Sequence, residues 1–435
     1  MMTQAYRASI LYCLDEPARV GAAAYRYHEE GLLWVENGRV RQVGDYAQLA
    51  PTLPTSVEII DYSGYLLTPG FIDTHVHYPQ LPMIASYGAQ LLDWLETYTF
   101  PTELGFAEYD YALQIAEAFL DELLRNGTTS ALVFATVHPA SVEAFFTAAQ
   151  ARKLRMIAGK VLMDRHAPAG LCEEPETAYH TSQDLIQRWH GQARLAYAVT
   201  PRFAPSCSPE LLDVAGSLLQ ADSSLYLHTH LAESTAEVRW VAELFPGAQH
   251  YLDVYERAGL LGARSVLAHG IHLCEGACQQ LSRTSSVLAH CPSSNLFLGS
   301  GLFPMRRYQE QGIRISLGTD VGAGTSFSML KTQGDAYRVQ QLQGELLEPM
   351  QAFYLATLGG ARALALEQQL GSLQPGQEAD FILLDPQATP LLAQRYAQSQ
   401  SIADTLFMLN LLGDDRVIAA TYILGELAWK RAVTC

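Results

Sequence analysis

The hydrophobic pattern divides the chain into two ends rich in short strands and a long middle in which strands alternate with helices. Residues 1–67 carry short apolar runs between turn residues, and Asn37-Gly38 between two of these runs is typical of a hairpin turn. Residues 371–435 return to the same pattern. The strands expected in the two ends span residues 8–13, 31–35, 40–43, 57–61, 380–385, 417–422 and 427–432.

The middle of the chain has a regular succession of apolar strands and amphipathic helices. The clearest helix places Ala112, Ala116, Phe119 and Leu123 on one face. A last helix is expected around residues 349–366. The eight strands that we expect span residues 66–75, 128–137, 155–163, 194–200, 225–231, 265–269, 286–290 and 314–317. Strands that alternate with helices in this way predict a parallel barrel.

These two patterns together predict an α/β protein with two domains. Residues 68–370 would form a TIM-type (β/α)8 barrel. Residues 1–67 and 371–435 would meet in a small β-sandwich domain, because both ends have the same strand-and-turn character. The length of 435 residues agrees with a large domain plus a smaller one.

Composition and charge exclude several classes of partner. Forty-five acidic and 28 basic residues give a net charge of −17, which opposes binding to nucleic acid or to an anionic membrane. No apolar run approaches the length of about 18–20 residues that a membrane span needs. We expect no signal peptide, and seven scattered cysteines suit reduced thiols. A cytoplasmic protein with a small-molecule ligand is therefore expected.

The first chemical signal is the pair His75 and His77 at the end of the first barrel strand. Residues i and i+2 of a strand face the same side, with Cα atoms roughly 6.5 Å apart. Both imidazoles can then reach one ion at about 2.0–2.1 Å. Two surface histidines would look the same, so this pair alone leaves the metal site open.

Later strands end in further ionisable side chains. Glu233 follows the strand at 225–231, while His269 and His290 close the next two strands. Carboxyl ends of barrel strands converge on one mouth, where such enzymes keep their chemistry. Three nitrogens and one oxygen there can bind a metal and leave a position for water, which is typical of a catalytic site. The candidate metal ligands are His75, His77, His230 and Asp320.

These motifs resemble the amidohydrolase superfamily and, within it, the guanine deaminase family, over essentially the whole chain. The superfamily features are the segment 69–77, the segment 230–233, the strand ending at His269, the segment 318–320 and the closing segment 371–380. The features similar to guanine deaminases are Gln80 and the segments 200–207, 290–295 and 298–301.

The resemblance implies a zinc enzyme that converts guanine and water to xanthine and ammonia. His75, His77, His230 and Asp320 would bind one zinc per chain, although the same donors also accept iron. The implied catalytic residues are Glu233, which would move protons, His269, which would orient the water, and Asp320. The implied substrate-binding residues are His77, Gln80, Arg202, Phe203, His230, Glu233 and Asp320. The resemblance also implies a homodimer.

The chemistry of these side chains agrees with that activity. Zinc lowers the pKa of bound water to about 7, which supplies a nucleophile at neutral pH. The carboxyl of Glu233 can both donate and accept the protons that a deamination moves. Arg202 offers planar donors, Phe203 offers a stacking face, and Gln80 has both a donor and an acceptor, as a lactam edge requires.

Three alternatives stay open. The same mechanism can act on 8-oxoguanine, pterin, cytosine or a triazine. A cyclic-amide hydrolase with two metals is disfavoured, because the fourth strand, unlike the third with Lys160, has no lysine to bridge them. A non-catalytic assembly protein is disfavoured because no ligand is missing. We interpret His228 as a core residue and His290 as a brace of the pocket. Residues 87–100, with Trp94, form either a lid or ordinary packing.

Overall fold

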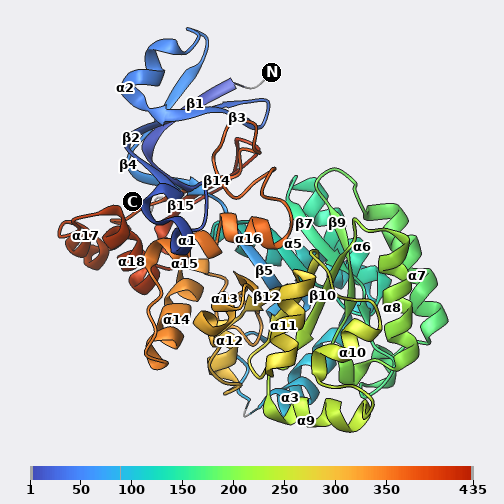
Figure 1. Cartoon of the computed structure of the whole chain (residues 1–435). Coiled ribbons are helices and arrows are strands. Elements are labelled where there is room, and N and C mark those ends of the chain that lie inside the picture. The colour runs from blue at the N-terminus through green and yellow to red at the C-terminus, as the bar shows by residue number, and fades with distance from the viewer. Residues whose placement is uncertain (1–2, 89, 433–435) are drawn as a thin grey trace.

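The computed structural model describes residues 3–88 and 90–432, which form a barrel and a separate sheet (Figure 1). The predicted fold class is confirmed, and the two chain ends meet in one seven-stranded mixed sheet in the order β16-β15-β14-β4-β1-β2-β3. The strands of this sheet are β1 (Thr3–Cys13), β2 (Tyr25–Glu36), β3 (Arg39–Asp45), β4 (Glu58–Pro69), β14 (Phe381–Leu384), β15 (Ile418–Ile423) and β16 (Glu426–Lys430). The division of the chain at residues 67 and 371 stays a prediction.

The hairpin predicted at Asn37-Gly38 joins β2 to β3. Both residues have a positive φ, 53° for Asn37 and 76° for Gly38. This combination matches the type I′ turn, whose twist suits the two strands that it joins.

The barrel contains eight parallel strands in chain order. They are β5 (Phe71–His77), β6 (Thr128–Phe134), β7 (Arg155–Gly159), β9 (Ala196–Pro201), β10 (Tyr226–Leu231), β11 (Ser265–His269), β12 (Val287–His290) and β13 (Arg314–Leu317). The short strand β8 (Val161–Leu162) pairs with β9. Backbone hydrogen bonds from Asp320 N to His75 O and from His77 N to Val321 O, each 2.9 Å long, link the last turn to the first strand.

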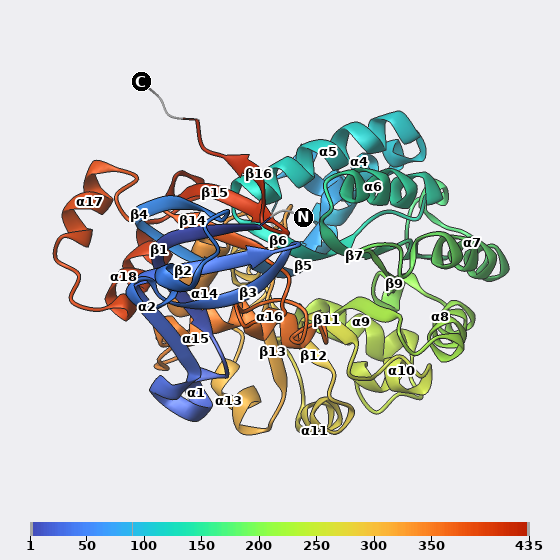
Figure 2. The same ribbon diagram turned by 90° about the horizontal axis from the view of Figure 1, so that it is seen from above.

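Helices surround the barrel, as the view from above shows (Figure 2). The longer outer helices are α5 (Tyr109–Arg125), α6 (Pro139–Ala151), α7 (Pro175–Trp189), α8 (Pro209–Ala221), α9 (Thr235–Leu244), α11 (Glu275–Thr284) and α14 (Met329–Leu342). The shorter ones are α3 (Leu91–Trp94), α4 (Phe100–Leu104), α10 (Tyr251–Arg257), α12 (Pro292–Phe297), α13 (Met305–Glu310), α15 (Pro349–Leu355) and α16 (Leu358–Ala363). Within the described residues, no helix has the length and apolar character to cross a bilayer.

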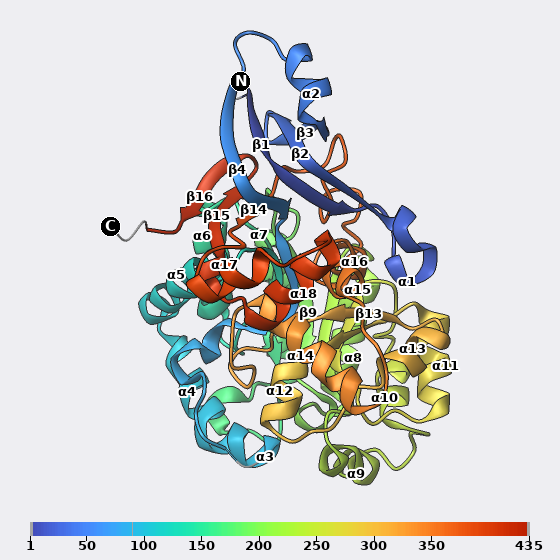
Figure 3. The same cartoon turned by 90° about the vertical axis from the view of Figure 1, so that its left-hand side faces the viewer.

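The remaining helices lie against the small sheet or against the barrel helices α14 and α15 (Figure 3). They are α1 (Pro17–Val20), α2 (Tyr46–Leu49), α17 (Pro390–Tyr396) and α18 (Ile402–Leu412). The helix α5 buries the stripe that the sequence predicted, including Ala112, Phe119 and Leu123. The helix α8 is capped by Ser208, whose hydroxyl accepts a hydrogen bond from Leu211 N.

Two predicted strands and one predicted helix are interrupted in the structure. The strand expected at 66–75 divides at Gly70, since β4 ends before it and β5 begins after it. A Cβ at Gly70 would lie 2.1 Å from Thr129 Oγ1, so the chain can turn there only without a side chain. The strand expected at 155–163 breaks at Lys160, whose buried ammonium pairs with Glu173. The helix expected at 349–366 divides into α15 and α16 at Thr357, which is not helical.

Alternate residues of the barrel strands fill its interior with apolar side chains. Ile72, Leu132, Ile157 and Val266 belong to this inner cluster, which Leu364 and the residues after it complete. The hydroxyl of Tyr226 in the same cluster donates a 2.8 Å hydrogen bond to Leu364 O. The interior below the mouth is therefore packed, and the chemistry is confined to the carboxyl ends of the strands.

Buried ion pairs fasten the returning chain to the amino ends of two barrel strands. The Arg194 guanidinium donates to Glu378 over 2.7 Å and also to Asp380. Arg155 donates to the other oxygen of Glu378 over 2.6 Å. Leu424 N donates to the free oxygen of Asp380 over 2.8 Å. Because the cluster joins β7 and β9 to the segments around β14 and β15, it couples the two parts of the protein.

Replacing Arg194 with leucine is expected to lower the free energy of unfolding by about 3–5 kcal/mol, because two buried carboxylates lose their shared partner. Denaturant unfolding measures this loss. Arg188 pairs with Glu143 but is 65% exposed, so Arg188→Leu is the matched control and should change stability by less than about 1 kcal/mol. Equal stability of the two variants would contradict the role of the cluster.

Candidate active site

A pocket opens at the carboxyl ends of the barrel strands. Small-molecule sites are concave and mostly apolar, with a few polar groups that fix the orientation of the ligand. The wall of this pocket combines apolar side chains with a few polar groups, as such sites require. The residues that line it are His77, Gln80, Leu91, Trp94, Leu95, Arg202, Phe203, His230, Glu233, Glu237, His269, Leu298, Asp320 and Ala323.

The four predicted metal ligands meet at the floor of this pocket. Asp320 Oδ1 lies 3.1 Å from His75 Nε2 and 3.2 Å from His77 Nε2. His77 Nε2 is 3.2 Å from His75 Nε2 and 3.3 Å from His230 Nε2. Donors in a tetrahedron around zinc are separated by about 3.3–3.4 Å when each lies 2.0–2.1 Å from the ion. The spacing of these four atoms therefore suits ligands of one small cation.

The protonation of the cluster also suits a cation. His230 Nδ1 lies 2.7 Å from the carbonyl oxygen of Arg202, which only accepts, so Nδ1 carries the proton and Nε2 presents its lone pair. Burial lowers the pKa of His77 to about 4 and holds that of His230 well below its usual value. Burial alone would raise the pKa of Asp320, but the facing histidines hold it well below its usual range. At neutral pH the cluster is therefore two neutral imidazoles beside a carboxylate.

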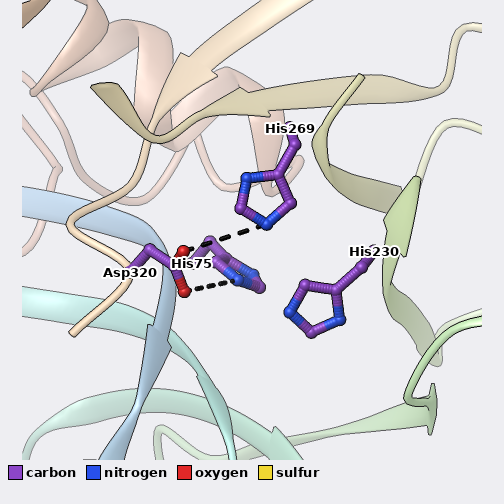
Figure 4. Close-up of side chains that lie close together, drawn as sticks. All are labelled: His75, His230, His269 and Asp320. Carbon is purple, nitrogen blue, oxygen red and sulfur yellow. Dashed lines mark ion pairs between the residues drawn. The ribbon is translucent and has the colours of Figure 1, made fainter. Parts of the chain in front are cut away.

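His269 faces one oxygen of the Asp320 carboxylate, and His75 faces the other (Figure 4). The ligand atoms of His75, His230, His269 and Asp320 lie within 4.8 Å of one another, so this set could also hold a metal. His269 Nε2 is 3.4 Å from Glu233 Oε2 and 3.8 Å from Asp320 Oδ2. These separations are longer than those around His77, which places His269 between the four predicted metal ligands and Glu233.

Glu233 is a buried carboxyl with a raised pKa. Burial is the main cause, and the charges of Asp320 and Glu237 add to it. The Ser300 hydroxyl donates to Glu233 Oε1 over 2.9 Å, and Glu233 N donates to Glu237 Oε2 over 2.8 Å. Glu233 is thus held in place as an acid that can give up a proton inside the pocket.

Three strand ends bend into the site through residues in the left-handed region. Ala232 has φ 46°, His269 has φ 70° and Asp320 has φ 52°. Non-glycine residues in this conformation are uncommon and cost free energy, and such residues cluster at functional sites. The bends after β10 and β13 turn Glu233 and Asp320 toward the same point.

The polar residues predicted to bind substrate lie on another wall. Gln80 Oε1 accepts a 3.1 Å hydrogen bond from Gly322 N, which fixes the orientation of the amide. Arg202 Nη1 donates to both oxygens of Glu103 over 2.9 Å. Phe203 is buried in an apolar cluster with Trp94 and other aromatic side chains. These side chains line the same pocket as His77, His230 and Asp320.

The comparisons with known proteins agree with this geometry. The model of the amidohydrolase family matches residues 66–428. The chain belongs to the amidohydrolase family. It is 48% identical over 418 residues to guanine deaminase of Escherichia coli (strain K12), covering 96% of this chain and 95% of that protein. It is 34% identical over 380 residues to guanine deaminase of Dictyostelium discoideum, covering 85% of this chain and 83% of that protein.

Solved structures of guanine deaminases have the same fold as this amidohydrolase. The Escherichia coli enzyme aligns with a TM-score of 0.96 at 47% identity, covering 99% of this chain and all of that chain. A Clostridium structure (C. acetobutylicum) with guanine bound in its active site aligns with a TM-score of 0.88 at 28% identity, covering 98% of this chain and all of that chain. The predicted family is confirmed.

The two histidines left open by the sequence have different surroundings. His228 Nε2 lies 2.7 Å from His75 Nδ1, so His228 supports the back of the metal-binding cluster. His290 stacks on Phe303 with ring centroids 4.3 Å apart and does not line the pocket. Its role as a brace stays a prediction. Part of the segment 87–100 is pocket wall, since Trp94 lines the cavity, whereas Tyr87 is 87% exposed.

Several residues of this amidohydrolase site were not assigned from the sequence. Asn295 Nδ2 lies 2.9 Å from His269 Nδ1, and Ser300 contacts Glu233. Both lie in segments that resemble guanine deaminases, so the sequence could have indicated them as site residues. Glu237 forms a capping box with Ser234, a local pattern that predicts a helix start. No sequence pattern pointed to Glu103, because its partner Arg202 lies 99 residues away in the chain.

Proposed function

We propose that this amidohydrolase deaminates guanine, with water as co-substrate and xanthine and ammonia as products. The observation that carries the proposal is the pocket in which Gln80, Arg202 and Phe203 face the buried cluster of His77, His230 and Asp320. The 48% identity to a guanine deaminase over nearly the whole chain supports guanine as the substrate.

We assign one metal to His75, His77, His230 and Asp320, with zinc preferred and iron as the alternative. The unprotonated His230 Nε2 and the ionised Asp320 support this assignment, because a cation needs lone pairs and negative charge. A bound zinc would lower the pKa of water to about 7 and so supply the nucleophile.

Glu233 has the central part in moving protons. Water adds its oxygen to the ring carbon that carries the amine, and the adjacent ring nitrogen takes the proton that Glu233 donates. The resulting carboxylate accepts one proton from the added oxygen and passes it to the amine, and it takes the second as the new carbonyl forms, which restores the acid. The carbon–nitrogen bond then breaks, and the amine leaves as ammonia. Burial favours the protonated form of Glu233, which supports its role as the first donor.

His269 and Asp320 orient the water. Neutral His269 lies within 3.8 Å of both Asp320 and Glu233, so it can bridge them through a water molecule. Asn295 and Ser300 hold His269 and Glu233 respectively, which keeps the proton donor and the water close together.

The base would lie between Phe203 and the polar wall. Arg202 would donate to the ring carbonyl or a ring nitrogen, and the Gln80 amide would pair with the lactam edge. Phe203 would stack on the ring. The ring amine would then face Glu233 and the metal.

We further propose that the protein acts in the cytoplasm as a homodimer. The cysteines of the described residues are unpaired, which supports a reducing compartment. The dimer rests on the resemblance to guanine deaminases. Light scattering of the purified protein tests it.

Metal-replete protein is expected to release ammonia from guanine with a higher kcat/KM than from 8-oxoguanine, pterin, cytosine or a triazine. The measurement is an ammonia assay over this panel, with xanthine formation followed by absorbance. A sample that binds its metal but leaves guanine unchanged refutes the proposed substrate. If the protein prefers another ring of the panel, that ring becomes the proposed substrate and the proposed mechanism stays the same.

A further inference from the structure

The buried guanidinium of Arg202 has a buried counter-ion on a separate element. Glu103 on α4 is fully buried, and Arg202 is only 3% exposed. Arg202 Nη1 lies 2.9 Å from each oxygen of Glu103. A charge pair removed from water in this way is costly unless both partners are well bonded, so the position of the carboxylate constrains the guanidinium.

Two further contacts tie Glu103 to the wall that faces the substrate. The ring of Phe100, one turn earlier on α4, lies 5.5 Å from the guanidinium carbon of Arg202. Burial raises the pKa of Glu103, while Arg202 and a hydrogen bond from the Gln80 side chain oppose that rise. One carboxylate therefore contacts both polar residues that we assign to the base.

We propose that Glu103 is a positioning residue for substrate recognition, which orients Arg202 and Gln80 and cancels the charge of Arg202 so that the pocket selects a neutral ring. This inference rests on the proposed function of the same pocket. Arg202 gives one nitrogen to Glu103 and keeps its other donors for the substrate. Without the carboxylate, a buried positive charge would face the ligand and favour an anionic ring.

The backbone of Arg202 explains why this role is separable from catalysis. Arg202 N donates to Leu162 O over 3.3 Å, and Arg202 O accepts from His230 N over 3.2 Å. These bonds hold the main chain, and with it the orientation of His230, independently of the side chain. Loss of Glu103 should therefore alter binding of the base far more than the chemical step.

The test compares Glu103→Gln with the wild type in guanine kinetics and in inhibition by urate, a purine that is an anion at neutral pH. We expect KM for guanine to rise about 10- to 100-fold, the effect of disturbing hydrogen bonds to a charged group. We expect kcat to stay within about threefold and urate to inhibit about tenfold more tightly. Unchanged KM and unchanged urate inhibition would overturn the inference.

Two companion variants separate charge from position. Glu103→Asp keeps the charge but shortens the side chain, so KM should rise while urate inhibition stays weak. Glu96→Gln removes a charge from an exposed position of the same region and should match the wild type. If Glu96→Gln reproduced the effect of Glu103→Gln, general electrostatics would account for it and the inference would be wrong.

A double variant keeps the inference testable if Glu103→Gln fails to fold. Glu103→Gln combined with Arg202→Gln removes both buried charges, a change that buried pairs tolerate better than the loss of one partner. It should show a raised guanine KM without tighter urate inhibition, and a wild-type KM would overturn the inference. Wild-type protein without guanine turnover would instead refute the proposed function, and calorimetric titration with urate would still compare Glu103→Gln with the wild type.

Discussion

Glu233→Gln is expected to lower kcat for guanine by about 10²–10⁴-fold, the usual contribution of a positioned general acid–base. Glutamine keeps the size of the side chain and can accept the hydrogen bond from Ser300. It has no acidic proton to give to the ring nitrogen and cannot carry a proton to the departing amine. Steady-state kinetics with guanine measure the loss.

Metal content distinguishes this role from a structural one. Glu233→Gln should retain its metal, because Glu233 is not one of the four assigned ligands and its carboxylate lies 3.4 Å from His269. Glu243 on α9 is exposed, and Glu243→Gln is the matched control with wild-type kcat and metal. Loss of metal from Glu233→Gln would mean that its carboxylate is a ligand.

Removal of the metal is expected to lower guanine turnover by at least about 10³-fold, since several kcal/mol of transition-state stabilisation are lost with it. His230→Ala should have the same effect, because it removes one of the four donors. Adding zinc should restore activity to the chelated protein but not to the variant. Ammonia release before and after chelation measures both effects.

Elemental analysis of the same samples gives the number of metals. We expect one metal per chain in the wild type and less than that in His230→Ala. His180 is an exposed histidine remote in sequence from the cluster, and His180→Ala should keep metal and activity. Two metals per chain would contradict the single site and favour a cyclic-amide hydrolase. Reconstitution with iron or zinc decides between the two ions.

The barrel was predictable because its strands carry a strong local signal. The strands at 265–269 and 314–317 have the bounds that the sequence predicted, since each is a continuous apolar run between turns. The assignment of residues 66–69 to the small sheet was not predictable in this way. Leu67 pairs with Leu383 in the small sheet, and no local pattern shows a partner so distant in the chain.

The meeting of the proposed metal ligands was predictable from topology, whereas their surroundings were not. His75 and His230 lie near the ends of β5 and β10, Asp320 follows the end of β13, and the ends of parallel strands in a barrel converge. Glu103 instead lies in an irregular helical segment, and only the folded chain shows that its carboxylate meets Arg202. Local sequence therefore gives positions on strands, but buried ion pairs depend on packing between distant segments.

The strand order of the small sheet means that one edge of β4 has no partner until the end of the chain has been synthesised. The edge of β4 is covered only when β14 pairs with it, and β15 must then cover β14. At typical elongation rates, about 15–60 s separate the emergence of the two strands from the ribosome. During that interval the growing chain presents an open edge that other chains can join. Chaperone demand should therefore be greatest late in translation, and truncation before β15 should favour aggregation.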